Sequence, residues 1–430
     1  MNCVFLFILF LFPFSAFSGA FLWDLTKTND RIQRKWQRPH LRWQYNPDNA
    51  SAGIQAIIQN ALQAWEQQST AQISDEFMGT TKEGPQNDTN LTVFFNINPI
   101  TYGAPVNVVA YTLLNTRGDG FLKNAADGPI VNANILLNPT LTSQWQTTPS
   151  TDPTQLDLQQ IITHEIGHAF GLAHSFLVDS IMYPAVPLPN TSAELKAVFR
   201  TPKRTLAQDD TAWIEMLYPV QNFDELTAQI AGRVTLGSQG FTGAHVIAVK
   251  TDEQDLAFTF LSQGGNPTLM TKGLQNVSTF SENNGNFQIK GLKPGTYRMI
   301  AQSGTSFLNF GLANVNAYLN QFGTPGIFPL EFWKNPDCAA TSALSNSNFS
   351  DSLTASSTFT LTANQAYCGI DIVAHTGDTV CGNQPSLQTN CNDDGGCSLN
   401  PSAGMPNYVL ILEISLFLLL ILGLRKQRAN

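Results

Sequence analysis

Residues His164 to His174 have the types and spacing of a metal-binding site. His164 and His168 are four positions apart, so on a helix both side chains project from one face and can reach one ion. Glu165 follows the first histidine, where its carboxylate can act on a metal-bound water rather than bind the metal. Gly171 permits the left-handed backbone that ends a helix, after which the chain can bring His174 back as a third ligand. Three imidazoles with one open position are typical of catalytic zinc, whereas structural zinc sites normally have four protein ligands.

The extended pattern HExxHxxGxxH is much more specific than HExxH alone. It uses three of the six histidines in the chain. A tight turn with a methionine under the metal should follow it. The stretch SIMYP, Ser180 to Pro184, supplies this turn and places Met182 eight residues after His174. The two patterns together predict a catalytic metal centre.

These motifs resemble those of the metzincin metalloproteases, and their details are similar to the matrixin branch, the relatives of matrix metalloproteinases. Ser175 directly after the third histidine and the S-x-M-Y-P form of the turn carry the resemblance to that branch. The resemblance implies that Glu165 is the general base and acid and that Met182 forms the floor of the site. It also implies one catalytic zinc ion, bound by His164, His168 and His174.

The function implied is that of a secreted, surface-anchored zinc endopeptidase, which hydrolyses peptide bonds with a metal-activated water and Glu165 as general base. We expect protein or peptide substrates. Nucleic acid is not expected as a partner, because the net charge of −9 provides no basic patch. The alternative is a surface adhesion or binding protein whose zinc domain is catalytically silent. The intact Glu165 argues against that alternative.

The length and composition predict an extracellular protein with more than one domain. A chain of 430 residues is too long for one core, and only 13% of its residues are charged. We expect a signal peptide over 1–20, a matrixin-like zinc metalloprotease domain over 21–224, a carboxypeptidase-regulatory-like β-sandwich over 225–376, a flexible linker over 377–407, and a transmembrane helix with a basic tail over 408–430.

The two ends of the chain carry apolar runs that predict export and anchoring. Residues 2–17 are almost wholly apolar and precede small residues, as in a secretory signal. Residues 408–424 form a second run, followed by a basic tail, which predicts a membrane span with the bulk of the chain outside. The preceding stretch, Asp393 to Gly404 with Cys397, resembles bacterial sorting signals that are cut and exchanged for an anchor. A buried C-terminal helix is the other interpretation.

The fold class expected is an α+β metzincin domain, with a twisted mixed sheet and three helices, followed by an all-β sandwich. Strands are expected at Leu41–Asn46, Leu91–Ile97, Val106–Asn115 and Ile130–Asn138. Helices are expected after a cap at Ser51, after Asp152-Pro153, and within Leu206–Pro219. In the matrixin fold, one of the last two strands is the edge along which a substrate lies extended.

Several other residues have more ordinary expected roles. By resemblance, Asp209 and Asp210 match the paired acids under the Met-turn, and an N-cap role for one of them is the alternative. Gly118–Gly120 and Asp127-Gly128 form ordinary turns or, as in matrixins, a calcium site. We expect the other histidines to face solvent or cap elements; they are His40, His245 and His375.

The C-terminal region contains strand and turn patterns but no catalytic constellation. Ile230–Val249 and Asn283–Ala301 resemble carboxypeptidase-regulatory-like, transthyretin-type domains, for which a spacer and a binding role both stay open. Two disulfides are expected there, and of three possible pairings we favour Cys338–Cys368 and Cys381–Cys391. No cysteine precedes the motif in the catalytic region, so latency through a propeptide cysteine on zinc is not expected.

Overall fold

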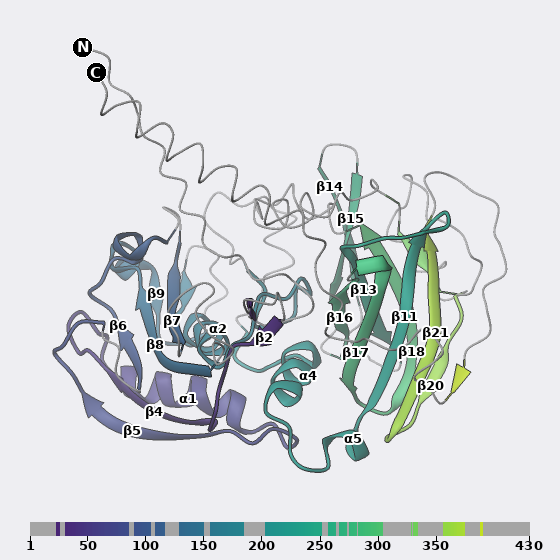
Figure 1. The fold of residues 1–430 in the computed structure, drawn as a ribbon. Helices are drawn as coiled ribbons and strands as arrows, with labels where there is room; N and C mark the ends of the chain where they lie inside the picture. The colour runs from purple at the N-terminus through teal and green to yellow at the C-terminus, as the bar shows by residue number, and fades with distance from the viewer. Residues whose placement is uncertain are drawn as a thin grey trace, which may run out of the picture.

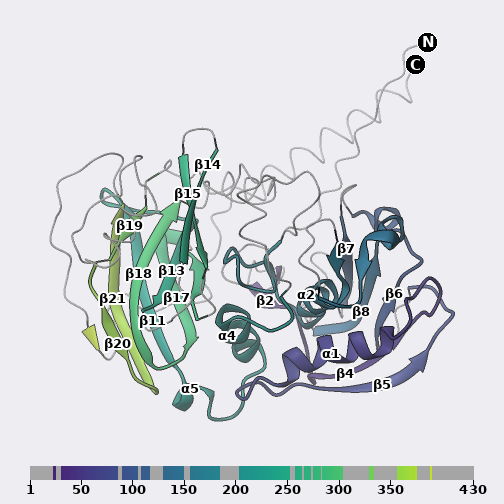
Figure 2. The same ribbon diagram turned by 180° about the vertical axis from the view of Figure 1, so that it is seen from behind.

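The structure is a computed structural model of the chain, and its described residues form two parts on either side of one helix. Figures 1 and 2 show helix α4 between a mixed sheet with helices and a second part made of strands. We call the second part, residues 228–374 together with the strand at 388–389, the β-module. The structure describes residues 23–25, 31–85, 90–104, 108–116, 129–149, 155–184, 203–251, 257–263, 266–272, 275–281, 283–303, 328, 330–333, 356–374 and 388–389.

The N-terminal part is built on a six-stranded mixed sheet in the order β3-β8-β6-β4-β5, with β7 paired to β8. The β7–β8 pair is antiparallel and the other pairs are parallel, so β7 forms an antiparallel edge. The strands are β3 (Lys35–Trp36), β4 (His40–Tyr45), β5 (Ser74–Thr80), β6 (Leu91–Phe94), β7 (Ala110–Thr116) and β8 (Pro129–Leu137).

Four of these strands lie where the sequence predicts them, and the mixed sheet agrees with the expected α+β class. β5 was not predicted. It is the outer strand on the side of β4, and its residues alternate between exposed and half-buried without one that is fully buried. Its sequence therefore lacks the strong apolar alternation that indicates a strand.

Helices accompany this sheet, and the last of them lead to the second part of the molecule. They are α1 (Ile54–Glu66), α2 (Leu158–Phe170), α4 (Gln208–Leu217) and the short α5 (Phe223–Leu226). The buried face of α1 has the predicted helical spacing, because Ile54, Ile57, Ile58, Ala61, Leu62 and Trp65 are all buried. Two 3₁₀ turns, η1 (Pro99–Tyr102) and η2 (Pro139–Gln144), follow β6 and β8.

Both predicted helix starts were wrong. The N-cap of α1 is Gly53 with a positive φ and no side-chain cap, rather than Ser51. The N-cap of α2 is Asp157, whose carboxylate accepts from Gln160 N at 2.9 Å, rather than Asp152. The chain is extended up to this cap, because β10 (Leu156–Asp157) pairs with β9 (Trp145–Gln146).

The β-module contains two five-stranded sheets. One has the order β12-β11-β21-β22 with β17 also on β11, and the other β16-β13-β18-β19 with β20 also on β18. Buried side chains from both sheets form one core cluster that includes Phe241, Phe287, Tyr297 and Trp333. The strands are β11 (Ala228–Leu236), β12 (Gln239–Gly240), β13 (Ala244–Lys250), β16 (Val277–Phe280), β17 (Asn286–Leu292), β18 (Gly295–Ser303), β19 (Glu331–Phe332), β20 (Phe359–Leu361), β21 (Gln365–Ala374) and β22 (Gln388–Thr389).

Smaller elements complete the described chain. Two hairpins pair β1 (Trp23–Leu25) with β2 (Arg31–Gln33) and β14 (Ala257–Gln263) with β15 (Asn266–Lys272), and η3 (Asn283–Gly285) precedes β17. β22 falls inside the range predicted as a linker.

Several predictions fall outside the described residues. They are the signal peptide, the 408–430 helix, the calcium turns and every cysteine that could pair with the buried Cys368. Among the helices that the structure describes, none is long and apolar enough to cross a membrane.

Candidate metal centre

Three histidines converge at the end of α2. The helix carries His164 and His168, and it ends at Gly171 with a φ of 108°. The chain then turns back and brings His174 to the other two. One ring nitrogen from each histidine lies within 4.8 Å of those of the others, and together they can hold a metal ion. His168 Nε2 and His174 Nε2 are 3.2 Å apart.

Glycine is required at the reversal. A Cβ on Gly171 would lie 1.9 Å from the carbonyl oxygen of Arg34, which passes beside the turn. The positive φ would strain any L-residue as well. The predicted break in the helix is therefore confirmed, and its position is fixed by a neighbouring backbone that no motif reveals.

The hydrogen bonds of two histidines leave their other nitrogens available for a metal. His164 Nδ1 is 2.8 Å from Ile181 O, and His168 Nδ1 is 2.8 Å from Leu172 O. A carbonyl only accepts, so each Nδ1 carries the proton and each Nε2 presents a lone pair. Burial, with the neighbouring His168, lowers the pKa of His164 to about 3, and burial lowers that of His168 to about 4. Neutral imidazoles facing one point fit a cation.

The turn after His174 packs against α2 through Met182. Met182 is buried, and a Cβ on Gly167 of α2 would lie 2.3 Å from its sulfur. Asp210 of α4 holds the turn, because its carboxylate accepts from Ile181 N at 2.8 Å and Met182 N at 3.1 Å. Asp210 also accepts from Ala207 N at 2.9 Å. Asp210 therefore lies under the turn, and the alternative N-cap role does not hold, because Ala207 is the N-cap of α4 and Asp210 is the third residue after it.

Glu165 lies between the histidines and the edge strand β7. It is buried, and its Oε2 is 2.6 Å from the hydroxyl of Thr112 on β7. Burial raises the pKa of Glu165 to about 7, while the Thr112 hydrogen bond acts in the opposite direction. Thr112 was missed from the sequence, because only the placement of β7 beside α2 brings it to the carboxylate.

The remaining histidines differ from one another. His40 is exposed, with Nδ1 2.8 Å from Ser74 Oγ, as expected for a surface residue. The expectation for His245 was wrong. It is 1% exposed on β13, because Phe176 and Phe280 pack against it. His375 lies outside the described residues.

Residues 35–219 match the matrixin family. The chain is 24% identical to stromelysin-1 of Mus musculus over 191 residues, which are 43% of this chain and 33% of that protein. It is 24% identical to interstitial collagenase of Bos taurus over 221 residues, 49% of this chain and 36% of that protein. Over a shorter stretch of 64 residues it is 42% identical to metalloendoproteinase 1 of Glycine max, covering 15% of this chain and 17% of that protein.

The chain thus spans about a third of the length of the two longer relatives and a smaller share of the third. The matches support the matrixin family, which implies an α+β metzincin domain with a catalytic zinc and hydrolase chemistry. The matched range ends at residue 219, before the β-module begins.

Proposed function

We propose that the chain is a zinc-dependent endopeptidase. In this proposal His164, His168 and His174 bind one zinc ion, Glu165 is the general base and acid, and Met182 forms the floor of the site. The observation that carries it is the convergence of three histidines, two of which direct their Nδ1 protons to backbone carbonyls, beside the buried carboxylate of Glu165 on α2.

In this proposal, the residues of the chain transfer protons and hold the catalytic carboxylate and the histidine rings in position. Zinc held at this site supplies a Lewis acid for peptide hydrolysis. Glu165 takes a proton from the attacking water and delivers it to the departing amine. The hydroxyl of Thr112 holds the carboxylate in place at 2.6 Å. The carbonyls of Ile181 and Leu172 fix the two ring orientations of His164 and His168.

We assign substrate binding to the edge strand β7. It pairs with β8 on one side, and it contacts α2 through Thr112 and Glu165. An extended peptide that adds to such an edge is held mainly by its backbone, which tolerates many sequences. Protein or peptide substrates are therefore expected.

The proposals about location rest on the sequence. They are secretion through residues 1–20 and anchoring through residues 408–430. The resemblance of residues 225–376 to carboxypeptidase-regulatory-like β-sandwiches and a calcium site at the 118–128 turns have the same basis.

The test is cleavage of casein by the full chain, with and without Glu165→Gln. We expect the variant to lose about 10²- to 10⁴-fold in activity while it still binds zinc, because only the proton-transfer group is changed. A chelator should abolish the activity, and added zinc should restore it. His40→Gln serves as a control, because His40 is exposed and outside the site. Full activity in Glu165→Gln would contradict the role of Glu165, and a zinc-loaded chain without activity would favour the silent adhesion protein.

A further inference from the structure

The β-module contacts the loop that carries the third histidine. Asp209 of α4 is 1% exposed, and its carboxylate lies between the two parts of the molecule. One oxygen accepts a hydrogen bond from the hydroxyl of Ser175, the residue after His174. The other oxygen accepts from the backbone N–H of Ser278 on β16, at 2.7 Å. A single carboxylate therefore joins the β-module to the neighbour of a proposed metal ligand.

The partner of Asp209 on the β-module is the free edge of a sheet. β16 is the terminal strand of its sheet in the part of the chain that the structure describes, and it pairs with β13 on its other side. The outward N–H of Ser278 would lack a partner at this buried edge without Asp209. In turn, a buried carboxylate is costly unless donors surround it. The Ser278 N–H and the Asp209 carboxylate therefore provide each other with a hydrogen-bond partner.

Aromatic packing surrounds this link. Phe176, two residues after His174, meets the ring of Phe280 of β16 edge-on, with ring centroids 5.0 Å apart. Phe176 also contacts His245, which is buried on β13. A small cavity at this junction is lined by residues of both parts, among them His174, Ser175, Asp209 and Ser278.

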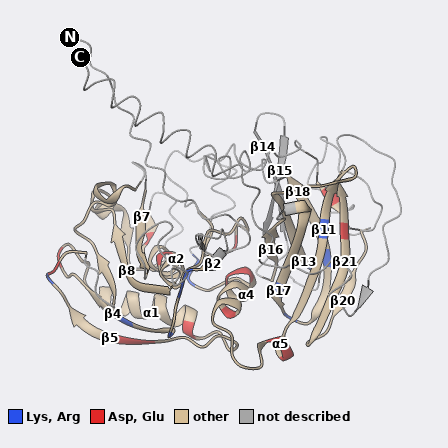
Figure 3. Cartoon of the chain, viewed as in Figure 1, with Lys and Arg blue, Asp and Glu red and all other residues tan. Residues whose placement is uncertain are grey.

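Helix α4 ties the same junction to the Met-turn. Its neighbouring acid Asp210 accepts from the backbone of Ile181 and Met182, while Asp209 accepts from Ser278. Figure 3 shows that α4, which lies between the two parts, carries acidic residues. The same end of α4 also contacts β17, because Gln208, the first residue of the helix, donates from Nε2 to Gly291 O at 3.2 Å.

We propose that the β-module is a positioning element of the metal centre, which acts through the Ser278 N–H, the Asp209 carboxylate and the Ser175 hydroxyl to hold His174 in place. The proposal rests on the proposed function only for the identity of the metal. Ser278 and Asp209 are positioning residues in this arrangement, since neither contacts the metal or substrate.

The test measures metal affinity in the full chain, by competition with a chelator for zinc. Ser278→Pro removes the N–H, and proline is tolerated on an edge strand where that N–H points away from the sheet. Ser278→Ala keeps the N–H and controls for the loss of the side chain. We expect zinc affinity to fall about tenfold in Ser278→Pro, the lower end of the range for groups that orient metal ligands, and to match the parent in Ser278→Ala.

Cobalt(II) provides a second readout, because its visible absorption bands depend on the arrangement of its ligands. We expect the bands of Ser278→Pro to shift and those of Ser278→Ala to match the parent. A folded Ser278→Pro with the parent's affinity and spectrum would overturn the proposal, as would equal weakening in Ser278→Ala. If Ser278→Pro fails to fold, Asp209→Asn decides by the same two measurements, because an amide cannot accept from both donors with both of its atoms.

The two proposals fail in different ways. A chain that binds zinc but does not cleave casein contradicts the endopeptidase and leaves the affinity comparison valid. A chain that cleaves casein with the same zinc affinity in Ser278→Pro and Asp209→Asn contradicts only the positioning role.

Discussion

The contact between Thr112 and Glu165 is the residue-scale feature that connects the edge strand to the chemistry. The Thr112 hydroxyl is 2.6 Å from the carboxylate and 3.1 Å from the backbone carbonyl of Glu165. Thr112→Val preserves the shape and removes the hydroxyl. Hydrogen bonds to charged groups contribute about 1.5–3 kcal/mol, so we expect kcat/KM for peptide cleavage to fall about tenfold.

Thr92→Val is the matched control for this prediction. It removes another buried hydroxyl from the same sheet, on β6, where the partner is Gln44 at 3.1 Å. We expect kcat/KM of Thr92→Val to stay close to the parent value. Equal activity in the parent and Thr112→Val would show that the hydroxyl does not orient Glu165.

Glu66 and Asp75 are two acids that interact with each other, far from the histidines in the sequence. Burial, together with the hydrogen bond and charge of Asp75, raises the pKa of Glu66 from 4.5 to about 7. Asp75 is held by Trp43 Nε1 at 2.6 Å and Gln59 Nε2 at 3.1 Å. The folded state therefore holds a proton on Glu66 at pH values where the unfolded chain has lost it.

The sign of the pH dependence follows from this shift. The stabilisation that Glu66 gives the folded state is fully present below about pH 4.5. As the pH rises toward 7 this stabilisation is lost, and the free energy of unfolding falls. Glu66→Gln removes the titrating group, so we expect a smaller loss of stability between pH 5 and 8 in urea unfolding. Glu76→Gln, at an exposed acid on β5, is the control. The same decline in Glu66→Gln and the parent would contradict this assignment.

At the residue scale, the convergence of the three histidines could be predicted from sequence, because one short motif contains all three and one helix carries two of them. His164, His168 and His174 fall within eleven residues; helix geometry brings the first two together, and the turn at the end of α2 returns the third. Thr112 and Ser278 could not be predicted, because they reach the site through a sheet edge and a second part of the chain. His245 was placed wrongly because its burial depends on Phe176, which comes from outside its own sheet.

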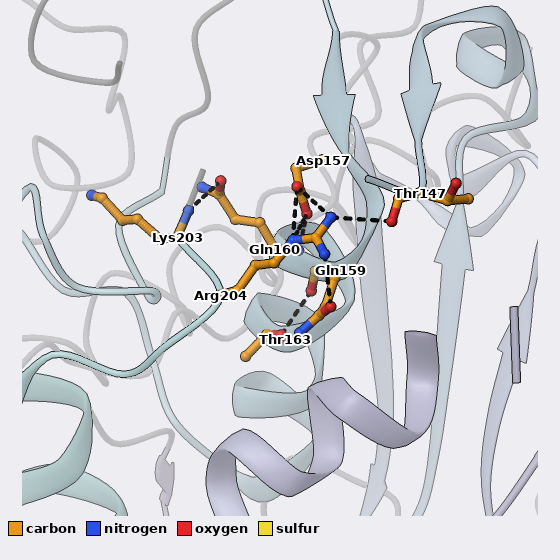
Figure 4. Close-up of polar contacts among 7 residues, drawn as sticks. All are labelled: Thr147, Asp157, Gln159, Gln160, Thr163, Lys203 and Arg204. Atoms are coloured by element: carbon orange, nitrogen blue, oxygen red, sulfur yellow. Dashed lines mark hydrogen bonds and ion pairs between the residues drawn. The ribbon is translucent and has the colours of Figure 1, made fainter. Parts of the chain in front are cut away.

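At the scale of the elements, the start of α2 was predicted least accurately from the sequence. Asp157 caps the helix and also pairs with Arg204, whose Nη2 lies 2.7 Å from its carboxylate. Figure 4 shows that the same guanidinium contacts Gln159 and the carbonyl of Thr147. Arg204 therefore fastens the chain before α4 to the start of the helix that carries His164 and His168.

Loss of this ion pair should be costly because Asp157 is buried. Its side chain is 4% exposed, and that of Arg204 is 23% exposed. We expect Arg204→Gln to lower the free energy of unfolding by about 2 kcal/mol, since a buried carboxylate loses its charged partner. Lys82→Gln breaks a pair with Asp48 in which both side chains are exposed, and should cost less than about 1 kcal/mol. Equal effects in urea denaturation would contradict the role of burial.

Elements with an internal apolar pattern could be predicted, and elements defined by their neighbours could not. α1 and β8 bury regular sets of residues, so their sequences were sufficient. β5 has no fully buried residue and is held by pairing with β4. The N-cap of α2 depends on β10 pairing with β9, which a local search for capping residues does not include.

At the scale of the whole molecule, α4 belongs to both cores. Ala212 packs in the core cluster of the β-module, whereas Trp213, Ile214 and Leu217 pack in that of the N-terminal part. Unfolding of one part therefore exposes surface of the other. We expect both parts to unfold together in a single transition.

Removal of the metal should lower the midpoint of this single unfolding transition, so that both parts of the chain unfold at a lower temperature. A ligand that binds only the folded state stabilises it by about 4 kcal/mol when its concentration is a thousand times its Kd. We expect a chelator to lower the midpoint of thermal unfolding for the whole chain. Two transitions, of which only one responds to the chelator, would contradict the coupling through α4.

The most direct measurement is proteolysis during a zinc titration of the metal-free full chain. If His164, His168 and His174 form one catalytic metal centre, casein cleavage should rise from zero and level off at about one zinc per chain. Cleavage that proceeds without zinc, or that does not respond to it, would contradict the proposed function.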